Sequence, residues 1–289
     1  MKKSLGIIGG SGLYVMEHMN LHNYHRIDTA WGDTSGPIAE CKYNDETIFF
    51  LARHGEGHTI PPSKINYRAN IEAFKKLGVT DILSISSVGS LNENLAPGSF
   101  IIIDQFIDFT RNRDSTFFDD IVVHVSMAHP TDKSLMHISK QALEQLSITH
   151  QYGGLYLCIE GPQFSTLRES KLFQSWGCDV VGMTGMPEAK LCREASLRYA
   201  SICMITDYDC WHPDYENVEV TNVLSTVNNN TKKAKKLIEV FSALYSETSI
   251  KNNLNSFNSL VTRKDKIKED TALKLQNIMP DLLKSLDSD

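Results

Sequence analysis

The sequence of 289 residues contains no apolar run of about 18 residues, the length that a membrane-spanning helix needs. It also has no block of lysine and arginine long enough to form a basic stripe, and its net charge is −6 with a pI near 5.9. These absences argue against a membrane span and against nucleic acid or an anionic membrane as the main partner. The first apolar run stops at Gly9 after only a few residues, whereas a secretory leader needs about 7–15.

Three sequence motifs that would indicate other classes of protein are missing as well. No C-x-x-C pair occurs among the six cysteines, several of which lie inside apolar runs, as reduced buried thiols do. The chain lacks the G-x-G-x-x-G spacing of dinucleotide-binding folds and the G-x-S-x-G turn of α/β-hydrolases. We therefore expect a reduced, cytoplasmic protein with the size of an enzyme.

Short apolar, β-branched runs alternate with helical patterns along most of the chain, which predicts an α/β protein whose sheet is covered on both faces. The predicted strands are 5–8, 47–52, 82–87, 100–103, 155–159, 180–183 and 202–205. Apolar spacing predicts one helix from Tyr67 to Leu77, ended by Gly78, and a long helix from Val223 to Tyr245.

The composition changes near residue 246, where we divide the chain into residues 1–246 and a C-terminal segment, residues 247–289. Residues 247–260 are rich in serine and asparagine, which is typical of a linker. Residues 264–286 are charged and carry a thin apolar stripe, which predicts a surface or interface helix pair, with disorder as the alternative. No chemical motif lies in this segment, so we expect it to be dispensable for catalysis.

Polar residues gather where the predicted strands end. Gly9-Gly10-Ser11-Gly12 follows the first strand, and its backbone N–H groups and hydroxyl could hold an anion, although by itself a tight turn explains it better. Arg53 and His54 end another strand, at the side of an α/β sheet where ligands bind, and the guanidinium fork suits phosphate. His54 and His58 do not predict a zinc site, because the glycines between them interrupt the helix that such a site needs.

Three further strands end in residues that could contact a ligand. Ser86 and Ser87 leave room for backbone N–H groups to approach an anion, although by themselves an ordinary strand exit explains them better. Phe164, beside Ser165, could stack on a flat ligand. Thr184 follows the strand at 180–183, where a helix cap is a sufficient explanation.

Two carboxylates, Asp207 and Asp209, follow the apolar strand at 202–205. In extended geometry they point to the same side, and two neighbouring carboxylates push one pKa upward. Such a pair could accept a hydrogen bond from an exocyclic amine and donate one to a ring nitrogen. A solvated acidic turn is the competing explanation, although such turns rarely follow so apolar a strand.

In this order the motifs resemble those of the trimeric purine nucleoside phosphorylase family. The strings that carry the resemblance are Gly6 to Leu13, Leu51 to Gly55, His58 to Ile60, Ile102 to Asp108, Ile159 to Pro162 and Thr206 to Trp211. The resemblance extends from about residue 4 to residue 245, so residues 1–246 would form a nucleoside phosphorylase domain. It implies a single α/β domain with a distorted, barrel-like mixed sheet flanked by helices, assembled as a homotrimer.

The resemblance also implies which residues form the site. Phosphate would be held by Ser11, Arg53, His54, Ser86, Ser87 and Thr184. The nucleoside would contact Met183, Phe164, Ser165, Val220, Val223 and Leu224. His124 would reach the site of a neighbouring subunit. Asp207 and Asp209 would read the base and supply the catalytic acid.

The activity implied is phosphorolysis of S-methyl-5′-thioadenosine to adenine and S-methyl-5-thio-α-D-ribose 1-phosphate, within purine and methionine salvage. Inorganic phosphate would be a co-substrate, and no metal or organic cofactor is expected. The string from Gly182 to Pro187 also occurs in relatives that prefer 6-oxopurines, so a methylthioinosine or 6-oxopurine nucleoside phosphorylase is an alternative. The aspartate pair favours adenine, because an ionised carboxylate repels the O6 atom of a 6-oxopurine. A hydrolytic nucleosidase and a non-catalytic nucleoside-binding protein are less favoured alternatives.

Overall fold

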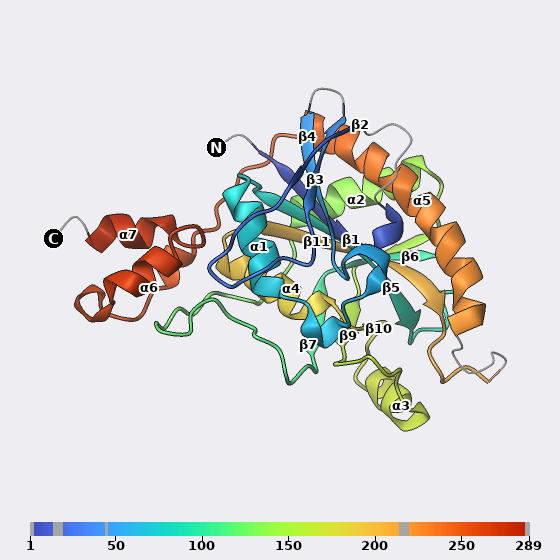
Figure 1. The fold of residues 1–289 in the computed structure, drawn as a ribbon. Coiled ribbons are helices and arrows are strands. Elements are labelled where there is room, and N and C mark those ends of the chain that lie inside the picture. The colour runs from blue at the N-terminus through green and yellow to red at the C-terminus, as the bar shows by residue number, and fades with distance from the viewer. Residues whose placement is uncertain (1–2, 14–19, 44–45, 214–219, 287–289) are drawn as a thin grey trace.

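The computed structural model describes residues 3–13, 20–43, 46–213 and 220–286. The strands are β1 (Leu5–Gly9), β2 (Asn20–His25), β3 (Ile38–Tyr43), β4 (Glu46–Ala52), β5 (Asp81–Ser90), β6 (Phe100–Ile103), β7 (Gln105–Asp108), β8 (His150–Tyr152), β9 (Leu155–Cys158), β10 (Val180–Gly182) and β11 (Arg198–Asp207). The helices are α1 (Tyr67–Lys76), α2 (Lys133–Gln145), α3 (Leu167–Ser175), α4 (Gly185–Glu194), α5 (Val220–Glu247), α6 (Glu269–Lys274) and α7 (Pro280–Leu286) (Figure 1).

All eleven strands of the described residues belong to one mixed sheet in the order β2-β3-β4-β1-β5-β10-β9-β7, with β11 pairing with β5 and β6, and β6 pairing with β8. The central strand β5 is parallel to β1 over its first half and parallel to β11 along nearly its whole length. At its end β5 turns to an antiparallel pairing with β10. The predicted α/β fold with a large mixed sheet flanked by helices is therefore confirmed.

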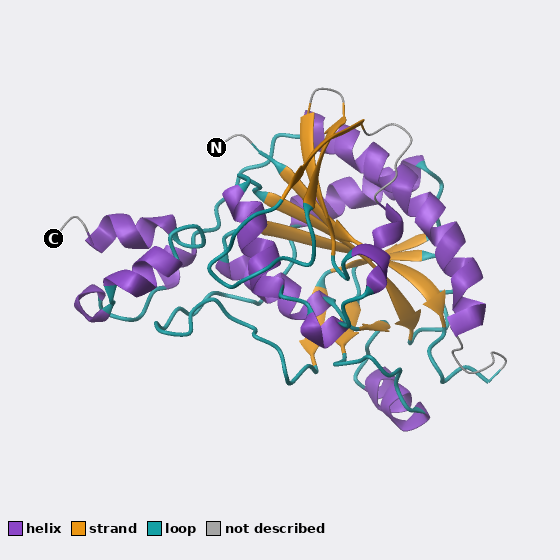
Figure 2. Cartoon of the chain, viewed as in Figure 1, coloured by secondary structure: helices purple, strands orange, loops and turns teal. Residues whose placement is uncertain are grey.

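Helices cover both faces of the sheet (Figure 2). Ile82 and Val88 of β5 pack in the buried cluster that contains α1 and α4, whereas Leu83 and Ile85 pack in the cluster that contains α2 and α5. This division follows from the alternation of side chains along a strand, and it explains why the strand is apolar on both faces.

The sequence prediction placed the ends of the apolar strands within four residues of the observed ones, with β6 matched at both ends, but missed β2, β3, β7 and β8. Two of these are short: β7 has four residues and β8 has three. β2 is mostly polar, and its described side chains are largely exposed. Short or exposed strands bury little apolar surface, so their sequences carry a weak strand pattern.

The C-terminal segment contains α6 and α7 and packs against the rest of the chain beside α1 (Figure 1). Leu275, Ile278 and Leu282 are at most 1% exposed and belong to the same cluster as α1 and α4. Asn277 donates a hydrogen bond to the buried carboxylate of Glu72 on α1 at 2.9 Å. Most of the apolar stripe seen in the sequence therefore docks on the main core, whereas Leu273 stays 42% exposed.

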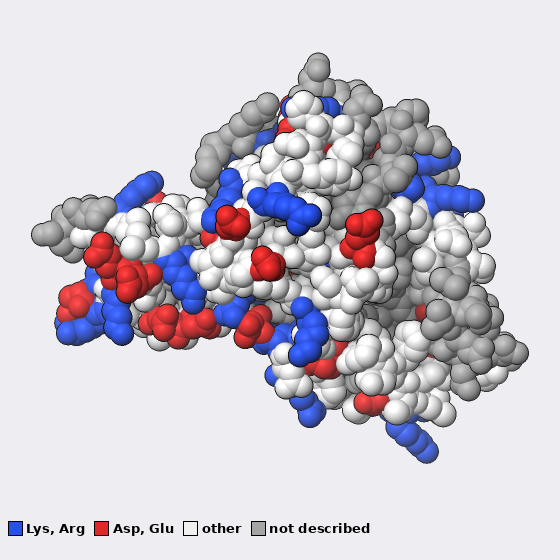
Figure 3. All heavy atoms as spheres, in the orientation of Figure 1, with Lys and Arg blue, Asp and Glu red and all other residues white. Residues whose placement is uncertain are grey.

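Charged side chains of both signs are interspersed over the described part of the face drawn in Figure 3. None of the helices in the described residues is long and apolar enough to cross a membrane.

Candidate active site

A pocket of about 550 Å³ lies at the carboxyl ends of β1, β5, β10 and β11. It brings together ten of the residues that the sequence singled out, namely Arg53, His54, Ser86, Ser87, Phe164, Ser165, Met183, Thr184, Asp207 and Asp209. The volume is in the range of small-molecule sites. Arg53 and Asp209 are 156 residues apart in the sequence. They meet here because β1, β4, β5 and β11 run parallel and end at the same edge of the sheet, whereas β10, which is antiparallel to β5, reaches the pocket from the opposite direction.

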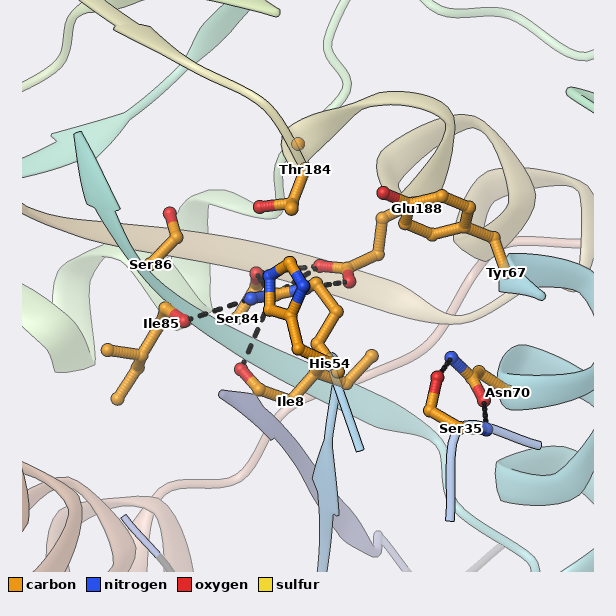
Figure 4. Close-up of polar contacts among 12 residues, drawn as sticks. Ile8, Ser35, His54, Tyr67, Asn70, Ser84, Ile85, Ser86, Thr184 and Glu188 are labelled. Atoms are coloured by element: carbon orange, nitrogen blue, oxygen red, sulfur yellow. Dashed lines mark hydrogen bonds and ion pairs between the residues drawn. The ribbon is translucent and has the colours of Figure 1, made fainter. Parts of the chain in front are cut away.

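One end of the pocket carries hydroxyl groups and a histidine. Ser86 from the end of β5, Thr184 from the start of α4 and His54 surround the same space (Figure 4). The prediction that Thr184 caps a helix is only half right. Thr184 occupies the N-cap position of α4, but its side chain makes no capping hydrogen bond, because its backbone torsions (φ −130°, ψ −12°) differ from those of an ordinary cap. Its hydroxyl is therefore available to a ligand.

The imidazole of His54 is held in one orientation by the backbone. Its Nδ1 atom is 2.8 Å from the carbonyl oxygen of Ile60, and because a carbonyl only accepts, Nδ1 carries the proton. Burial lowers the pKa of His54 to about 4, so the ring is neutral at pH 7. Its Nε2 atom is then an acceptor, which suits a protonated phosphate oxygen rather than a bare one. His58 stacks on His54 with ring centroids 4.1 Å apart and also lines the pocket.

The guanidinium of Arg53 lies in the pocket wall, where it is already paired. Its Nε donates to Glu188 Oε2 at 2.7 Å, its Nη2 donates to Glu188 Oε1 and Ser84 Oγ, and its Nη1 donates to the carbonyl of Ile85 (Figure 4). One of the two hydrogens on Nη1 has no partner among these contacts. No sequence motif assigned a role to Glu188, and its pairing with Arg53 depends on the tertiary structure.

The aspartate pair also lines the pocket. Asp207 is the last residue of β11, and its two carboxylate oxygens accept hydrogen bonds from the Thr206 hydroxyl at 2.6 Å and the Asp209 backbone N–H at 2.8 Å. Gly89 on the neighbouring β5 makes the close approach possible, because a Cβ atom there would lie 2.8 Å from Asp207 Oδ1.

The expectation that both aspartates share an extended strand is wrong. Asp209 lies beyond the end of β11 with φ 51°, in the left-handed region, because the chain turns there to bond its own N–H to Asp207. The two carboxyls still face one pocket. Burial raises both pKa values, and for Asp209 burial, with the neighbouring charge of Asp207, raises the pKa to about 6. One carboxyl of the pair can therefore hold a proton near neutral pH.

Phe164, Ser165 and Met183 line the pocket as predicted, and Phe164 is 50% exposed. Val227, Asn228 and Thr231 of α5 close another side of the pocket, and the sequence analysis did not assign them. Thr231 lies four residues after Val227 and three after Asn228 on one helix, a spacing that could have indicated a common face.

Five predicted residues are not placed in the pocket. The side chains of Ser11, Val220, Val223 and Leu224 lie outside the described residues, although the neighbours Gly10 and Gly12 line the pocket. His124 lies elsewhere, in the loop of residues 109–132, where it is exposed and its backbone N–H bonds Ser259 at 3.0 Å. Within the described ranges, no group of three or more His, Cys, Asp or Glu side chains is arranged to hold a metal ion.

Hydroxyl groups and an acid pair line one pocket at the edge of a mixed sheet, so the site can bind an anion and donate a proton to a second group. The chain belongs to the phosphorylase superfamily, whose family model matches residues 4–243.

Individual relatives narrow this class. The chain is 49% identical over 240 residues to the S-methyl-5′-thioadenosine phosphorylase of Rhodospirillum rubrum, covering 83% of this chain and 82% of the relative. It is 42% identical over 281 residues to the protein of the same name from Koribacter versatilis, covering 96% of both chains.

Among solved structures, a methylthioadenosine phosphorylase from an Antarctic soil metagenomic library superposes with a TM-score of 0.91 at 40% identity, covering 96% of this chain and 99% of that one. The Schistosoma mansoni methylthioadenosine phosphorylase in complex with adenine gives a TM-score of 0.83 at 36% identity, covering 86% and 93%.

Proposed function

We propose that this protein catalyses the phosphorolysis of S-methyl-5′-thioadenosine to adenine and S-methyl-5-thio-α-D-ribose 1-phosphate. The observation that carries the proposal is the carboxyl pair Asp207 and Asp209, which lines the same pocket as the hydroxyl residues Ser86 and Thr184. The kinship with enzymes of that name supports the choice of substrate.

The aspartate pair matches the edge of adenine. Adenine presents N6 as a donor and N7 as an acceptor, so one ionised and one protonated carboxyl satisfy both atoms. The acid donates its proton to N7 as the C1′–N9 bond breaks. The electron pair of that bond goes to N9, so adenine leaves as a neutral base. The protein therefore supplies the acid and holds it against N7 of the base.

The hydroxyl end of the pocket holds the phosphate. A phosphate oxygen attacks C1′ and forms the new C1′–O bond while the sugar carries oxocarbenium-like charge. Because Arg53 is paired with Glu188, the hydroxyls and backbone N–H groups supply most of the donors. Positioning and hydrogen bonding dominate, and no metal or organic cofactor takes part.

The decisive experiment assays methylthioadenosine, methylthioinosine, adenosine and inosine with and without phosphate. We expect phosphate-dependent release of adenine, fastest from methylthioadenosine. Release of adenine without phosphate would show a hydrolytic nucleosidase, and faster turnover of methylthioinosine would show a 6-oxopurine enzyme. No turnover of any of the four would indicate a nucleoside-binding protein.

We also propose a homotrimer with sites near the subunit boundaries. Phe164, Leu167, Leu172 and Trp176, on and beside α3, are each 43–50% exposed, and exposed apolar patches commonly mark protein interfaces. His124 would act across such a boundary. Sedimentation that finds an active monomer would contradict this assembly. A reduced cytoplasmic setting is supported by six free cysteines, five of them buried.

A further inference from the structure

Arg113 is a buried cation that none of the sequence motifs contains. It lies in the loop of residues 109–132 between β7 and α2, and its side chain is 1% exposed. It does not line the pocket, yet its guanidinium donates to two segments next to the pocket, and one further contact is with the Tyr67 hydroxyl of α1 at 3.3 Å.

The first segment that Arg113 binds is the turn between β10 and α4. Its Nη1 donates to the carbonyl oxygens of Met183 at 2.7 Å and Met186 at 2.6 Å. These two carbonyls flank Thr184, whose hydroxyl faces the phosphate end of the pocket. The same guanidinium edge therefore holds both sides of the turn that presents Thr184.

The second segment is the chain that leaves β9 toward Phe164. The Nη2 atom donates to the carbonyls of Ile159 at 3.3 Å and Glu160 at 2.7 Å, and Nε donates to the Glu160 carboxylate at 3.0 Å. The other oxygen of that carboxylate accepts the backbone N–H groups of Arg111 and Asn112 at 2.6 and 3.1 Å. The loop and the β9 segment thus hold each other in place.

We propose that Arg113 is a positioning residue, which fixes the separation between the segment carrying Thr184 and Met183 and the segment leading to Phe164. This deepens the proposed function and rests on it, because these segments would hold phosphate, ribose and base. The carbonyls of one segment accept from Nη1 and those of the other accept from Nη2, and the flat guanidinium fork with five donors can bond both segments at once. A lysine has three donors on one nitrogen and cannot reach both segments in the same way.

The test compares Arg113→Ala and Arg113→Lys with a matched control, Arg68→Ala. Arg68 is anchored to the same loop, through Asp114 at 2.5 Å and Asp119 at 2.7 Å, but the structure gives it no contact with either pocket segment. If displacement of the site is the cause, Arg113→Ala lowers kcat/KM by about 10²-fold and raises KM for both phosphate and the nucleoside. Arg113→Lys recovers part of the loss, and Arg68→Ala stays near wild type.

A merely structural role predicts a different pattern, in which kcat falls with the folded fraction while both KM values stay unchanged. That pattern would overturn the proposal, as would a control variant that is as impaired as Arg113→Ala. If Arg113→Ala does not fold, the KM values of Arg113→Lys decide between the same outcomes.

Hydrogen–deuterium exchange supplies a readout that does not depend on activity. We expect faster exchange in Arg113→Ala or Arg113→Lys than in Arg68→Ala at residues 159–166 and 183–187, with the other protected segments alike. Equal exchange there would refute the positioning role even if the enzyme is a phosphorylase. Conversely, a wild-type protein that releases no adenine with phosphate refutes the proposed function, while exchange still decides the role of Arg113.

Discussion

Arg53 and Glu188 form a buried ion pair in the wall of the active-site pocket, with Nε and Oε2 2.7 Å apart and both side chains 2% exposed. The Ser84 and Tyr199 hydroxyls donate to the same carboxylate at 2.7 and 3.0 Å. Burial lowers the pKa of Arg53, but attraction and hydrogen bonding to Glu188 outweigh it and hold the pKa above its ordinary value. The arginine that the sequence assigned to phosphate is therefore largely neutralised by a partner 135 residues away.

The pair predicts that Arg53→Ala loses stability as well as phosphate. Removing one partner leaves a buried charge unpaired, so we expect the free energy of unfolding to fall by about 3–5 kcal/mol. Urea unfolding measures this loss, and steady-state kinetics should show a raised KM for phosphate. Glu188→Gln is the control that keeps the shape but removes the negative charge. Unchanged phosphate KM and kcat in Arg53→Ala would remove this residue from the phosphate site.

The base preference predicts the behaviour of Asp207→Asn. The amide keeps the shape of the carboxyl but cannot take part in protonating N7, so turnover of methylthioadenosine should fall by about 10²–10⁴-fold. The amide can donate to O6, so the relative use of methylthioinosine should improve. The measurement is kcat/KM for both nucleosides in wild type and variant. A preference that does not move would show that the pair does not read the base.

Asp209 predicts a pH-dependent difference in stability between wild type and Asp209→Asn. Its pKa is about 6 in the folded protein against an ordinary value of 3.8, so the folded state binds the proton more tightly. The contribution of this group to the free energy of unfolding is fully present below about pH 3.8 and is lost as the pH rises through about 6. An asparagine does not titrate. The free energy of unfolding of the variant, relative to that of wild type, should therefore rise by about 1 kcal/mol from pH 5 to pH 8. A constant difference in unfolding free energy across that range would contradict the raised pKa.

The C-terminal segment predicts a change in stability without a change in chemistry. Leu275, which follows α6, is 1% exposed in the main core, so Leu275→Ala should lower the free energy of unfolding by about 2–5 kcal/mol. Leu273, on α6, is 42% exposed. Leu273→Ala should therefore change the free energy of unfolding by less than about 0.5 kcal/mol. Both variants should keep the kcat of the folded enzyme, because neither residue lines the pocket. A Leu275→Ala enzyme that is stable but inactive would instead tie this segment to catalysis.

The buried strands and the residues at their ends could be predicted from the sequence because their signal is local. An apolar run such as Ile82 to Ile85 needs both faces covered, which indicates a central strand between helical layers. The polar residues that follow such runs meet at one edge in any sheet with parallel strands. Their order along the chain was specific enough to indicate the family, and the comparisons confirm it.

The tertiary structure alone decided which charges meet. Arg53 pairs with a distant carboxylate, and Arg113 bonds the carbonyl oxygens of two other segments. Because every residue has a carbonyl, no side-chain pattern in the sequence predicts such contacts. The left-handed turn at Asp209 and the docking of Leu275 on the core likewise depend on neighbours far apart in sequence. Apolar periodicity can be recognised from consecutive residues, whereas the environment of a buried charge forms only when separate segments pack together.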